Sequence, residues 1–213
     1  MKTLLVYGAG GFGLEILHIF KTSYNNFYNK IIFVDDSSCL SNNKELNTYT
    51  IINLQDALSR YSPNDADFVI SVANPLQRAS LLTVVEENRF PLATLKDQTA
   101  VIRDTAVIEK GSIICAQCYV GPSVLIGKNT LIHGQVLLGH DSIVGSNTSI
   151  YCNSNILGGV TIGNNVEIGT GVNIYPNCKI GDNTKIAMGS SVYKDVQNNS
   201  LVQGNPARIM KKY

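Results

Sequence analysis

Aliphatic residues recur at every sixth position through the second half of the chain. The series comprises Ile102, Ile108, Ile114, Val120, Ile126, Ile132, Leu138, Val144, Ile150, Ile156, Ile162, Ile168, Ile174, Ile180, Ile186 and Val192. A small or β-branched residue stands two positions before each of them: Ala100, Ala106, Ser112, Cys118, Val124, Thr130, Val136, Ser142, Thr148, Ser154, Val160, Val166, Val172, Cys178, Thr184 and Ser190. Because side chains alternate between the two faces of a β-strand, two inward residues at this spacing predict one short strand and one corner per hexad. Three hexads then make a triangular coil of about 18 residues, and stacked coils satisfy each other's backbone hydrogen bonds.

Glycine follows several of the aliphatic residues, with asparagine or aspartate nearby, as at Gly121, Gly127, Gly139, Gly145, Gly163, Gly169 and Gly181. These residue types tolerate the positive φ of a tight corner. We therefore expect them to form the corners of the coils.

The N-terminal part of the chain has a different pattern. An apolar run from Thr3 to Tyr7 predicts a buried strand, and the apolar segment from Leu14 to Phe20 predicts a helix. Between them lies the glycine turn Gly8-Ala9-Gly10-Gly11-Phe12-Gly13. A second strand is predicted from Ile31 to Val34, followed directly by Asp35-Asp36.

A third strand is predicted from Phe68 to Val72, followed by Ala73-Asn74-Pro75 and a helix from about Leu76 to Asn88. Strands that alternate with helices indicate a parallel sheet, here about half the size of a doubly wound fold. The predicted fold is thus an α/β half-Rossmann domain over residues 1–95, followed by an all-β parallel β-helix with a C-terminal tail over residues 96–213.

The formal net charge is only +1, from 17 Lys and Arg against 16 Asp and Glu. Nucleic acids and anionic membranes require clustered basic residues, so neither is an expected partner. The apolar run from Leu4 to Tyr7 is too short for a signal peptide, and no stretch approaches the length of a membrane span. We expect a cytoplasmic protein.

Five cysteines, Cys39, Cys115, Cys118, Cys152 and Cys178, form no paired CxxC spacing. An odd number without such spacing indicates reduced thiols, with neither disulfides nor a metal site.

The glycine turn has the strand–turn–helix context of a phosphate site, because glycines allow close approach of the backbone and the helix N-terminus presents free N–H groups. Asp35 or Asp36 would accept a ribose hydroxyl or a base edge. A dinucleotide cofactor is disfavoured because the chain offers only one mononucleotide half. A tight turn without a ligand is the plain alternative, and a nucleotide held by its phosphates and base is the favoured interpretation.

Two histidines interrupt the repeat at corners, His133 and His140. They are seven residues apart, whereas residues stacked on one corner are 18 apart. They therefore face different corners and do not form a stacked metal pair. His140 is followed by Asp141, whose carboxylate suits the support of a general base. One coil further lies Gly158, whose backbone N–H is accessible to an oxyanion. These three residues predict a catalytic corner.

The hexad series resembles the hexapeptide-repeat acyltransferases, which fold as a left-handed parallel β-helix, an exception to right-handed crossovers. With the glycine turn and Asp35-Asp36 in front of it, the chain resembles the nucleotide-sugar amino N-acetyltransferases and the related sialic acid O-acetyltransferase-like proteins. The resemblance implies acetyl-CoA as co-substrate, a nucleotide-linked amino sugar as acceptor, and a homotrimer with active sites between subunits.

The same resemblance assigns roles to individual residues. It makes His140 the base and Asp141 its partner, and it places the Gly158 amide against the thioester. It assigns nucleotide-sugar binding to Gly10, Gly11, Phe12, Asp35, Asp36, Ala73 and Asn74. It assigns contacts with CoA to Ser149, which stands where some relatives place a histidine, and to the segment Gly204-Asn205-Pro206-Ala207-Arg208. Thr170 and Met188 share a corner at the spacing of one coil, so we expect them to line the pantetheine groove.

Two other functions and two residue assignments stay open. An O-acetyltransferase would use the same base on a sugar hydroxyl, and a non-catalytic sugar-nucleotide-binding solenoid would leave His140 and Gly158 without a purpose. Thr170 and Met188 are equally well explained as ordinary corner residues. For His133 a surface role is favoured over a contact with a neighbouring subunit's site.

Overall fold

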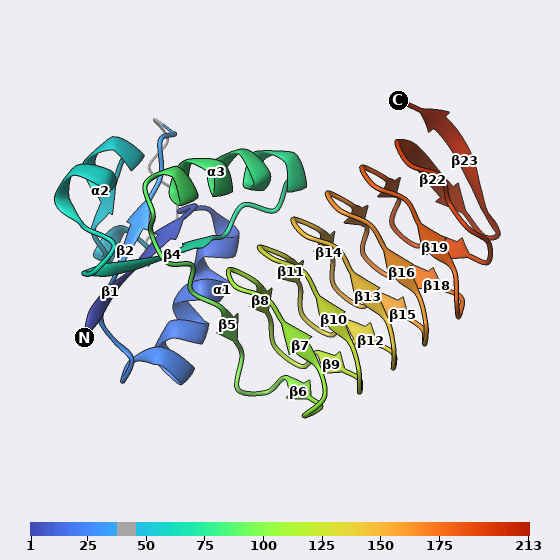
Figure 1. Ribbon diagram of the computed structural model, residues 1–213, viewed down its shortest axis with the longest axis horizontal. Helices are drawn as coiled ribbons and strands as arrows, with labels where there is room; N and C mark the ends of the chain where they lie inside the picture. Colours follow the sequence, from blue (N-terminus) through green and yellow to red (C-terminus); the bar gives the residue numbers. More distant parts are fainter. Residues whose placement is uncertain (38–45) are drawn as a thin grey trace.

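The computed structural model describes residues 1–37 and 46–213 and contains a small α/β domain followed by a long β-helix (Figure 1). The predicted fold class is confirmed. Cys39 lies outside the described residues, and the four cysteines within them are free thiols. None of the helices in the described ranges is both long and apolar enough to cross a membrane.

A four-stranded parallel sheet, in the order β3-β2-β1-β4, forms the N-terminal domain. Its elements in chain order are β1 (Lys2–Tyr7), α1 (Gly11–Ile19) with a π-helical turn (Phe20–Tyr24), β2 (Tyr28–Val34), a 3₁₀ turn (Leu46–Thr48), β3 (Ile51–Ile52), α2 (Leu54–Arg60), β4 (Ala66–Ile70) and α3 (Pro75–Glu87). The three predicted strands and two predicted helices are all present. β3 and α2 were not predicted.

The two faces of this sheet have separate cores because neighbouring side chains of β1 point in opposite directions. Leu4 packs with Ile16 and Leu17 of α1, whereas Leu5 packs with Ala57 of α2 and Leu82 of α3. The α1 side of the core continues onto the outer surface of the β-helix through Leu95, Ile113 and Leu131. The core on the α1 side therefore spans both domains.

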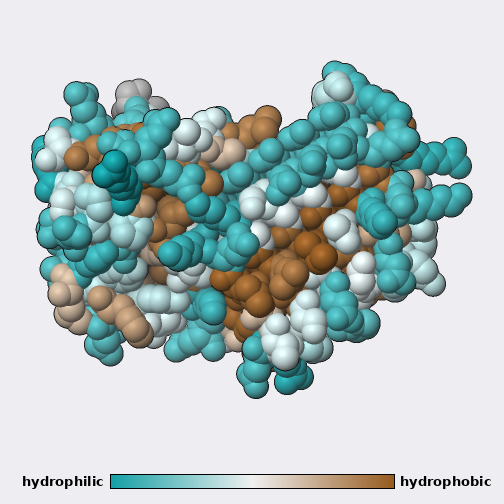
Figure 2. Space-filling model, in the orientation of Figure 1, coloured by the Kyte–Doolittle hydropathy of each residue, from teal (hydrophilic) through white to brown (hydrophobic). Residues whose placement is uncertain are grey.

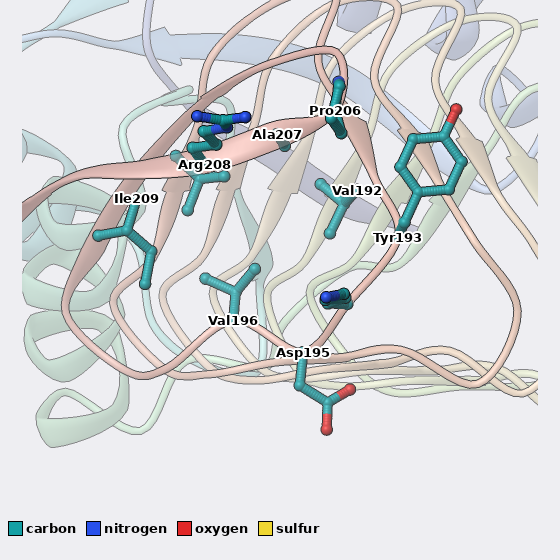
Figure 3. Close-up of a pocket in the computed structure, with 10 residues that line it drawn as sticks. Val192, Tyr193, Asp195, Val196, Pro206, Ala207, Arg208 and Ile209 are labelled. Atoms are coloured by element: carbon teal, nitrogen blue, oxygen red, sulfur yellow. The ribbon is translucent and has the colours of Figure 1, made fainter.

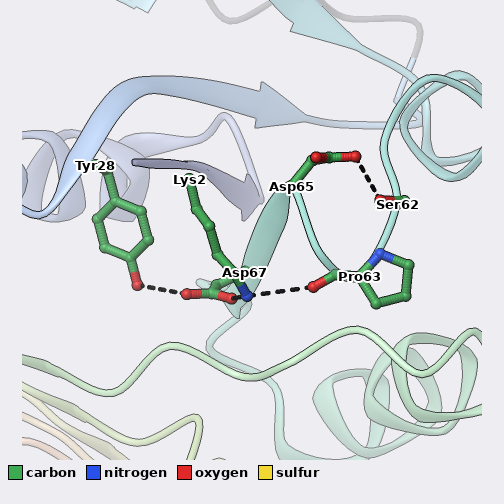
Figure 4. A network of polar contacts seen from close by, with 6 residues as sticks. All are labelled: Lys2, Tyr28, Ser62, Pro63, Asp65 and Asp67. Carbon is green, nitrogen blue, oxygen red and sulfur yellow. Dashed lines mark hydrogen bonds and ion pairs between the residues drawn. The ribbon is translucent and has the colours of Figure 1, made fainter.

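A polar network holds the amino ends of the strands together (Figure 4). Asp67 of β4 accepts hydrogen bonds from Lys2 Nζ at 2.7 Å and from the Tyr28 hydroxyl at 3.1 Å, so one carboxylate joins β1, β2 and β4. Lys2 also donates to the Pro63 carbonyl at 3.2 Å. The opposite, carboxyl edge of the sheet carries the glycine turn and the other candidate binding loops.

The β-helix begins at β5 (Leu95–Lys96), which already pairs with β8, so the predicted domain boundary falls within a strand of the helix. Three parallel sheets follow, with the strand orders β19-β16-β13-β10-β7, β22-β20-β17-β14-β11-β8-β5 and β21-β18-β15-β12-β9-β6. The strands are β6 (Val101–Ile102), β7 (Val107–Ile108), β8 (Ile113–Ile114), β9 (Tyr119–Val120), β10 (Leu125–Ile126), β11 (Leu131–Ile132), β12 (Leu137–Leu138), β13 (Ile143–Val144), β14 (Ser149–Ile150), β15 (Asn155–Ile156), β16 (Thr161–Ile162), β17 (Glu167–Ile168), β18 (Asn173–Ile174), β19 (Lys179–Ile180), β20 (Lys185–Ile186) and β21 (Ser191–Val192). A hairpin of β22 (Ser200–Gly204) and β23 (Ala207–Lys212) closes the far end.

The predicted inward series forms the interior of the β-helix. From Ile114 to Val192 its members are almost fully buried in one cluster, together with the small residues two positions earlier. Ile102 and Ile108 are only partly buried. They lie in the first coil, which no earlier coil covers.

The glycines directly after the aliphatic residues are not the corner residues with positive φ, contrary to the expectation. Positive φ occurs at every sixth residue from Gly111 to Gly189, most often at asparagine, three positions after the inward aliphatic residue. The glycines directly after the aliphatic residues have ordinary φ and serve another purpose. A Cβ on Gly139 would lie 2.6 Å from the backbone nitrogen of Gly158, so these glycines permit the close approach of the next coil.

Candidate active site

His140 and Asp141 lie at the corner between β12 and β13. The Nδ1 atom of His140 is 2.7 Å from Oδ2 of Asp141, and both side chains are about two-thirds exposed, at 69% and 65%. Asp141 occupies the positive-φ position of its corner, with a φ of 59°. A carboxylate on Nδ1 fixes the tautomer in which Nε2 is free to accept a proton.

Gly158 lies against the His140 ring, one coil further along the helix. A Cβ at Gly158 would be 2.6 Å from His140 Nε2, so only glycine fits beside the ring in this position. The pairing of Leu138 with Ile156 sets this stacking. Within the described residues the Gly158 N–H donates to no protein acceptor. The three residues of the predicted catalytic corner are therefore brought together.

An apolar track continues from this corner toward the C-terminal end of the β-helix. Leu157, Tyr175 and Tyr193 each follow the inward residue of their coil and are 36%, 56% and 52% exposed. The two tyrosine rings are 5.8 Å apart. We did not predict this track, although its 18-residue spacing after inward positions is visible in the sequence.

The track ends at a hollow of about 320 Å³ under the β22–β23 hairpin (Figure 3). Tyr193 lines the hollow, as do Pro206, Ala207 and Arg208 of the predicted C-terminal segment. In Figure 3, residues of β23 face Val196 across the hollow. Tyr193 belongs both to the track and to the lining of the hollow, so the two adjoin.

Ser149 does not reach this surface. Its side chain is fully buried, and its hydroxyl donates to the Ala73 carbonyl at 2.7 Å, so it joins the two domains. Thr170 and Met188 are exposed, but they follow β17 and β20 and lie on a different corner from His140. Within one chain these three predicted CoA contacts do not gather around the candidate base.

His133 is largely buried at the contact between the domains, whereas the favoured prediction was a surface role. Its ring lies 4.8 Å from Phe12 and is stacked at 4.7 Å on Tyr151. Burial, with the nearby positive charge of Arg78, lowers the pKa of His133 to about 4. Its Nε2 atom is buried without a hydrogen-bond partner in the described part of the chain. His133 is therefore a neutral residue at the contact between the domains.

The predicted nucleotide loops lie together at the carboxyl edge of the N-terminal sheet. Gly10 and Gly11 are exposed, and a Cβ at either position would meet no atom within 4 Å. The turn therefore leaves open space at the N-terminus of α1, where Phe12 packs toward the β-helix. Open space at a helix N-terminus leaves room for an anion to approach the backbone N–H groups.

Asp35 and Asp36 organise these loops. Asp35 accepts hydrogen bonds from the Ala9 N–H at 2.8 Å and from Ser37, and Asp36 accepts from the Tyr7 hydroxyl at 2.7 Å and from the Leu54 N–H at 2.8 Å. Partial burial acts to raise the pKa of Asp35, but the hydrogen bonds outweigh it and the pKa lies below its ordinary value. Both carboxylates thus have structural partners, and Asp36 is exposed whereas Asp35 is half-buried.

Asn74 caps α3, because its side chain accepts hydrogen bonds from the N–H groups of Leu76 and Gln77. Next to it a hollow of about 430 Å³ opens between the start of α3 and the outer face of β17 and β20. Lys185 and Glu167 form an ion pair at 2.9 Å on that face. The loop that carries Ala73 and Asn74 therefore borders open space.

Comparison with known proteins supports the two-part architecture. Residues 3–85 match the PglD N-terminal domain, and residues 141–176 and 159–194 match the bacterial transferase hexapeptide (six repeats). No curated protein matches the sequence.

Solved structures resemble the whole chain. WeeI from Acinetobacter baumannii AYE is 27% identical with a TM-score of 0.89, covering 99% of this chain and 100% of that one. The acetyltransferase domain of PglB from Neisseria gonorrhoeae FA1090, in complex with acetyl coenzyme A, is 24% identical with a TM-score of 0.90, covering 98% and 99%. PerB from Caulobacter crescentus, in complex with CoA and GDP-perosamine, is 19% identical with a TM-score of 0.87, covering 99% and 98%. The order of the two domains is thus shared along the full chain.

Proposed function

We propose that this chain, which joins a PglD N-terminal domain to bacterial transferase hexapeptide repeats, is an acetyl-CoA-dependent N-acetyltransferase. Its acceptor is the amino group of a nucleotide-linked amino sugar. The observation that carries the proposal is the corner at which His140 is held by Asp141 and lies directly over Gly158. An acyl transfer is accelerated by a base and an oxyanion donor that lie beside the same reacting carbonyl.

The residues at this corner suit a direct transfer. Nε2 of His140 takes a proton from the attacking amine while the new C–N bond forms. The Gly158 N–H donates to the carbonyl oxygen as negative charge develops there. The C–S bond then breaks, and the thiolate leaves and takes up a proton to become the thiol. No side chain has to form a covalent bond, so positioning of the two substrates supplies much of the acceleration.

The apolar track and the hollow at its end offer a binding surface for acetyl-CoA. Leu157, Tyr175 and Tyr193 lead away from the base, and Arg208 at the end carries a positive charge suited to phosphate. PglB and PerB, solved with acetyl coenzyme A and CoA, support this co-substrate.

The nucleotide sugar is assigned to the carboxyl edge of the N-terminal sheet. The open glycine turn offers backbone N–H groups to the phosphates, and Asp35 and Asp36 face the position of the base and ribose. The Ala73-Asn74 loop borders the same edge. The complex of PerB with GDP-perosamine supports an acceptor of this class.

The proposal requires a homotrimer. The nucleotide loops face the corner of His133, whereas His140 lies on another corner, so the N-terminal domain of one subunit must serve the base of its neighbour. Thr170 and Met188 would then line the CoA groove from the second subunit. Figure 2 shows a hydrophobic band across the β-helix, and the outward residues Leu125 and Ile143 are 44% and 41% exposed. Such a band favours coverage by another copy.

The proposal also assigns the enzyme to the cytoplasm, where acetyl-CoA and nucleotide sugars are made. The four free thiols of the described residues suit a reducing compartment. An acetylated nucleotide sugar is a precursor for polysaccharide or glycoprotein assembly.

A thiol-release assay tests the function. Acetyl-CoA is mixed with UDP-, GDP- and dTDP-linked amino sugars and with the matching sugars that carry a hydroxyl in place of the amine. We expect thiol release with at least one amino sugar, an amide in the product by mass spectrometry, and loss of both with the His140→Asn variant. Release only with hydroxyl sugars would replace the proposal with an O-acetyltransferase. If none of the acceptors gives thiol release, the chain would be a binding solenoid.

A further inference from the structure

Arg78 is a charged residue in the interior of the molecule. It projects from the second turn of α3, is only 1% exposed, and has the largest side chain among the fully buried residues of ranges 1–37 and 46–213. Within the described residues no carboxylate forms an ion pair with it. A buried cation without a counter-charge is costly unless hydrogen bonds replace its hydration shell.

Five backbone carbonyls surround its guanidinium. Nη1 donates to Val72 at 2.7 Å and Ala73 at 3.0 Å, and Nε donates to Asn129 at 2.9 Å. Nη2 donates to Asn147 at 2.6 Å and Thr148 at 2.9 Å. Burial lowers the pKa of Arg78 to about 10, so the group stays charged at neutral pH.

These acceptors belong to three separate segments. Val72 and Ala73 lie in the loop between β4 and α3, Asn129 belongs to one corner of the β-helix, and Asn147 and Thr148 belong to the corner one coil further. Arg78 therefore attaches the loop to two successive coils. Only a guanidinium has enough fixed donors to do this with one side chain.

The loop has a second attachment to the β-helix. The Ala73 carbonyl also accepts a hydrogen bond from Ser149 at 2.7 Å, and the next residue, Asn74, caps α3. The position of Ala73 and Asn74 is thus set by the β-helix as much as by their own sheet.

We propose that Arg78 is a positioning residue for nucleotide-sugar binding, which holds the Val72–Asn74 loop in its binding conformation against the β-helix. The inference rests on the proposed function. Ser149 assists it through the Ala73 carbonyl. Neither side chain touches the substrate or the reacting atoms.

The test compares Arg78→Lys and Ser149→Ala with Lys128→Met as a matched control. Lys128 forms an ion pair with Glu86, so it also ties α3 to the β-helix, but it does not touch the loop. Hydrogen exchange over residues 71–77 is measured in the unliganded proteins. KM for the amino-sugar nucleotide and for acetyl-CoA, and the affinities for UDP, GDP and dTDP, are measured well below the melting temperature of each variant.

In Arg78→Lys we expect faster exchange over residues 71–77 and a KM for the amino-sugar nucleotide raised roughly 10- to 100-fold, with kcat and the KM for acetyl-CoA nearly unchanged. Ser149→Ala should raise the same KM roughly 3- to 10-fold, as expected for one hydrogen bond, and it serves alone if Arg78→Lys does not fold. Lys128→Met should change neither exchange in the loop nor either KM.

Unchanged nucleotide affinity in a folded variant whose loop exchanges faster would overturn the role of Arg78, as would an equal rise in both KM values. If the wild type acetylates no amino sugar, the proposed function fails separately, and the affinities for UDP, GDP and dTDP still decide whether Arg78 positions the loop. A wild type that binds none of the three nucleotides would overturn both the proposed function and the role of Arg78.

Discussion

Asp141 occupies a corner position where the backbone has a positive φ, and asparagine is the most frequent residue at the equivalent positions of other coils. Aspartate shares with asparagine a tolerance of this conformation. The carboxylate that faces His140 therefore costs the fold little. At this corner the coils before and after carry Ser123 and Gly159, so a carboxylate beside the histidine is a feature of this coil and not of its two neighbours.

The equivalence of aspartate and asparagine at such a corner gives a clean test of the catalytic pair. His140→Asn should lower kcat roughly 10²- to 10⁴-fold, the effect of losing one positioned base. Asp141→Asn should lower kcat less and leave the melting temperature unchanged, because asparagine suits the corner. Steady-state kinetics with both substrates measures this, and the exposed His18→Asn is the control. Unchanged turnover in His140→Asn would refute the proposed base.

A substitution at Gly158 tests whether activity requires the space beside the His140 ring. In Gly158→Ala the new Cβ would fall 2.6 Å from His140 Nε2 and must displace an exposed side chain that is free to swing. We expect stability within about 0.5 kcal/mol of the wild type and a loss of kcat of roughly 10²-fold. Thermal melting and kinetics on the same sample check both. Gly134→Ala, whose Cβ would meet only the Ala116 carbonyl at 3.4 Å, should stay active.

At the scale of elements, the strands of the β-helix could be predicted because two registers repeat without a slip, and each coil restricts the next. β3 and α2 escaped prediction because both are short and their burial depends on the rest of the sheet. Arg78 escaped for a different reason: a basic residue in an amphipathic helix normally faces water, and no pattern shows that α3 lies against the β-helix. Ser149 was misassigned because spacing cannot show which outward positions the N-terminal domain covers.

The inward register predicts that a carboxylate unfolds the β-helix at an inward position but is tolerated at an outward position of the next strand. Ile168→Asp places a carboxylate at a site that is 0% exposed and should cost several kcal/mol, enough to abolish cooperative folding of the β-helix. Asn173→Asp puts the same group on the outward, exposed side of β18 and should melt like the wild type. Circular dichroism melting distinguishes them, and equal melting curves would contradict the register.

At the scale of the whole molecule, stability should depend on the pH through His133 at the contact between the domains. Its pKa is about 4 in the folded protein against about 6.5 when unfolded. Between these values the unfolded chain binds a proton that the folded chain does not, so the free energy of unfolding falls as the pH drops. The loss should amount to about 2–3 kcal/mol between pH 6.5 and pH 4.

His133→Phe removes the titrating group but keeps a ring between Phe12 and Tyr151. Chemical denaturation at intervals from pH 4 to pH 7 should therefore give a shallower slope for this variant than for the wild type. The exposed His18→Asn variant should keep the wild-type slope. Parallel curves for His133→Phe and the wild type would show that His133 is not neutral in the folded state.

Assembly is the second property of the whole molecule that can be tested. Light scattering at micromolar concentration should give three times the chain mass of 23.1 kDa. A Leu125→Asp and Ile143→Asp double variant should shift the mass toward the monomer, because two charges would be buried in the interface. A monomeric wild type would contradict the shared active site.

The stacked coils also act as a molecular ruler. Leu138, Ile156, Ile174 and Val192 pair in succession, so three coil steps separate the coil of His140 from the coil that begins the end hollow. At about 4.8 Å per step this fixes a span of about 14 Å. The span is quantised, because a deletion of a whole coil shortens it by one step and leaves every later residue on its own corner, whereas a deletion of one or two hexads keeps the inward register but moves the later residues to a different corner. In the proposed complex, the distance that acetyl-CoA has to span from the base to the end hollow is therefore set by the number of coils rather than by any side chain.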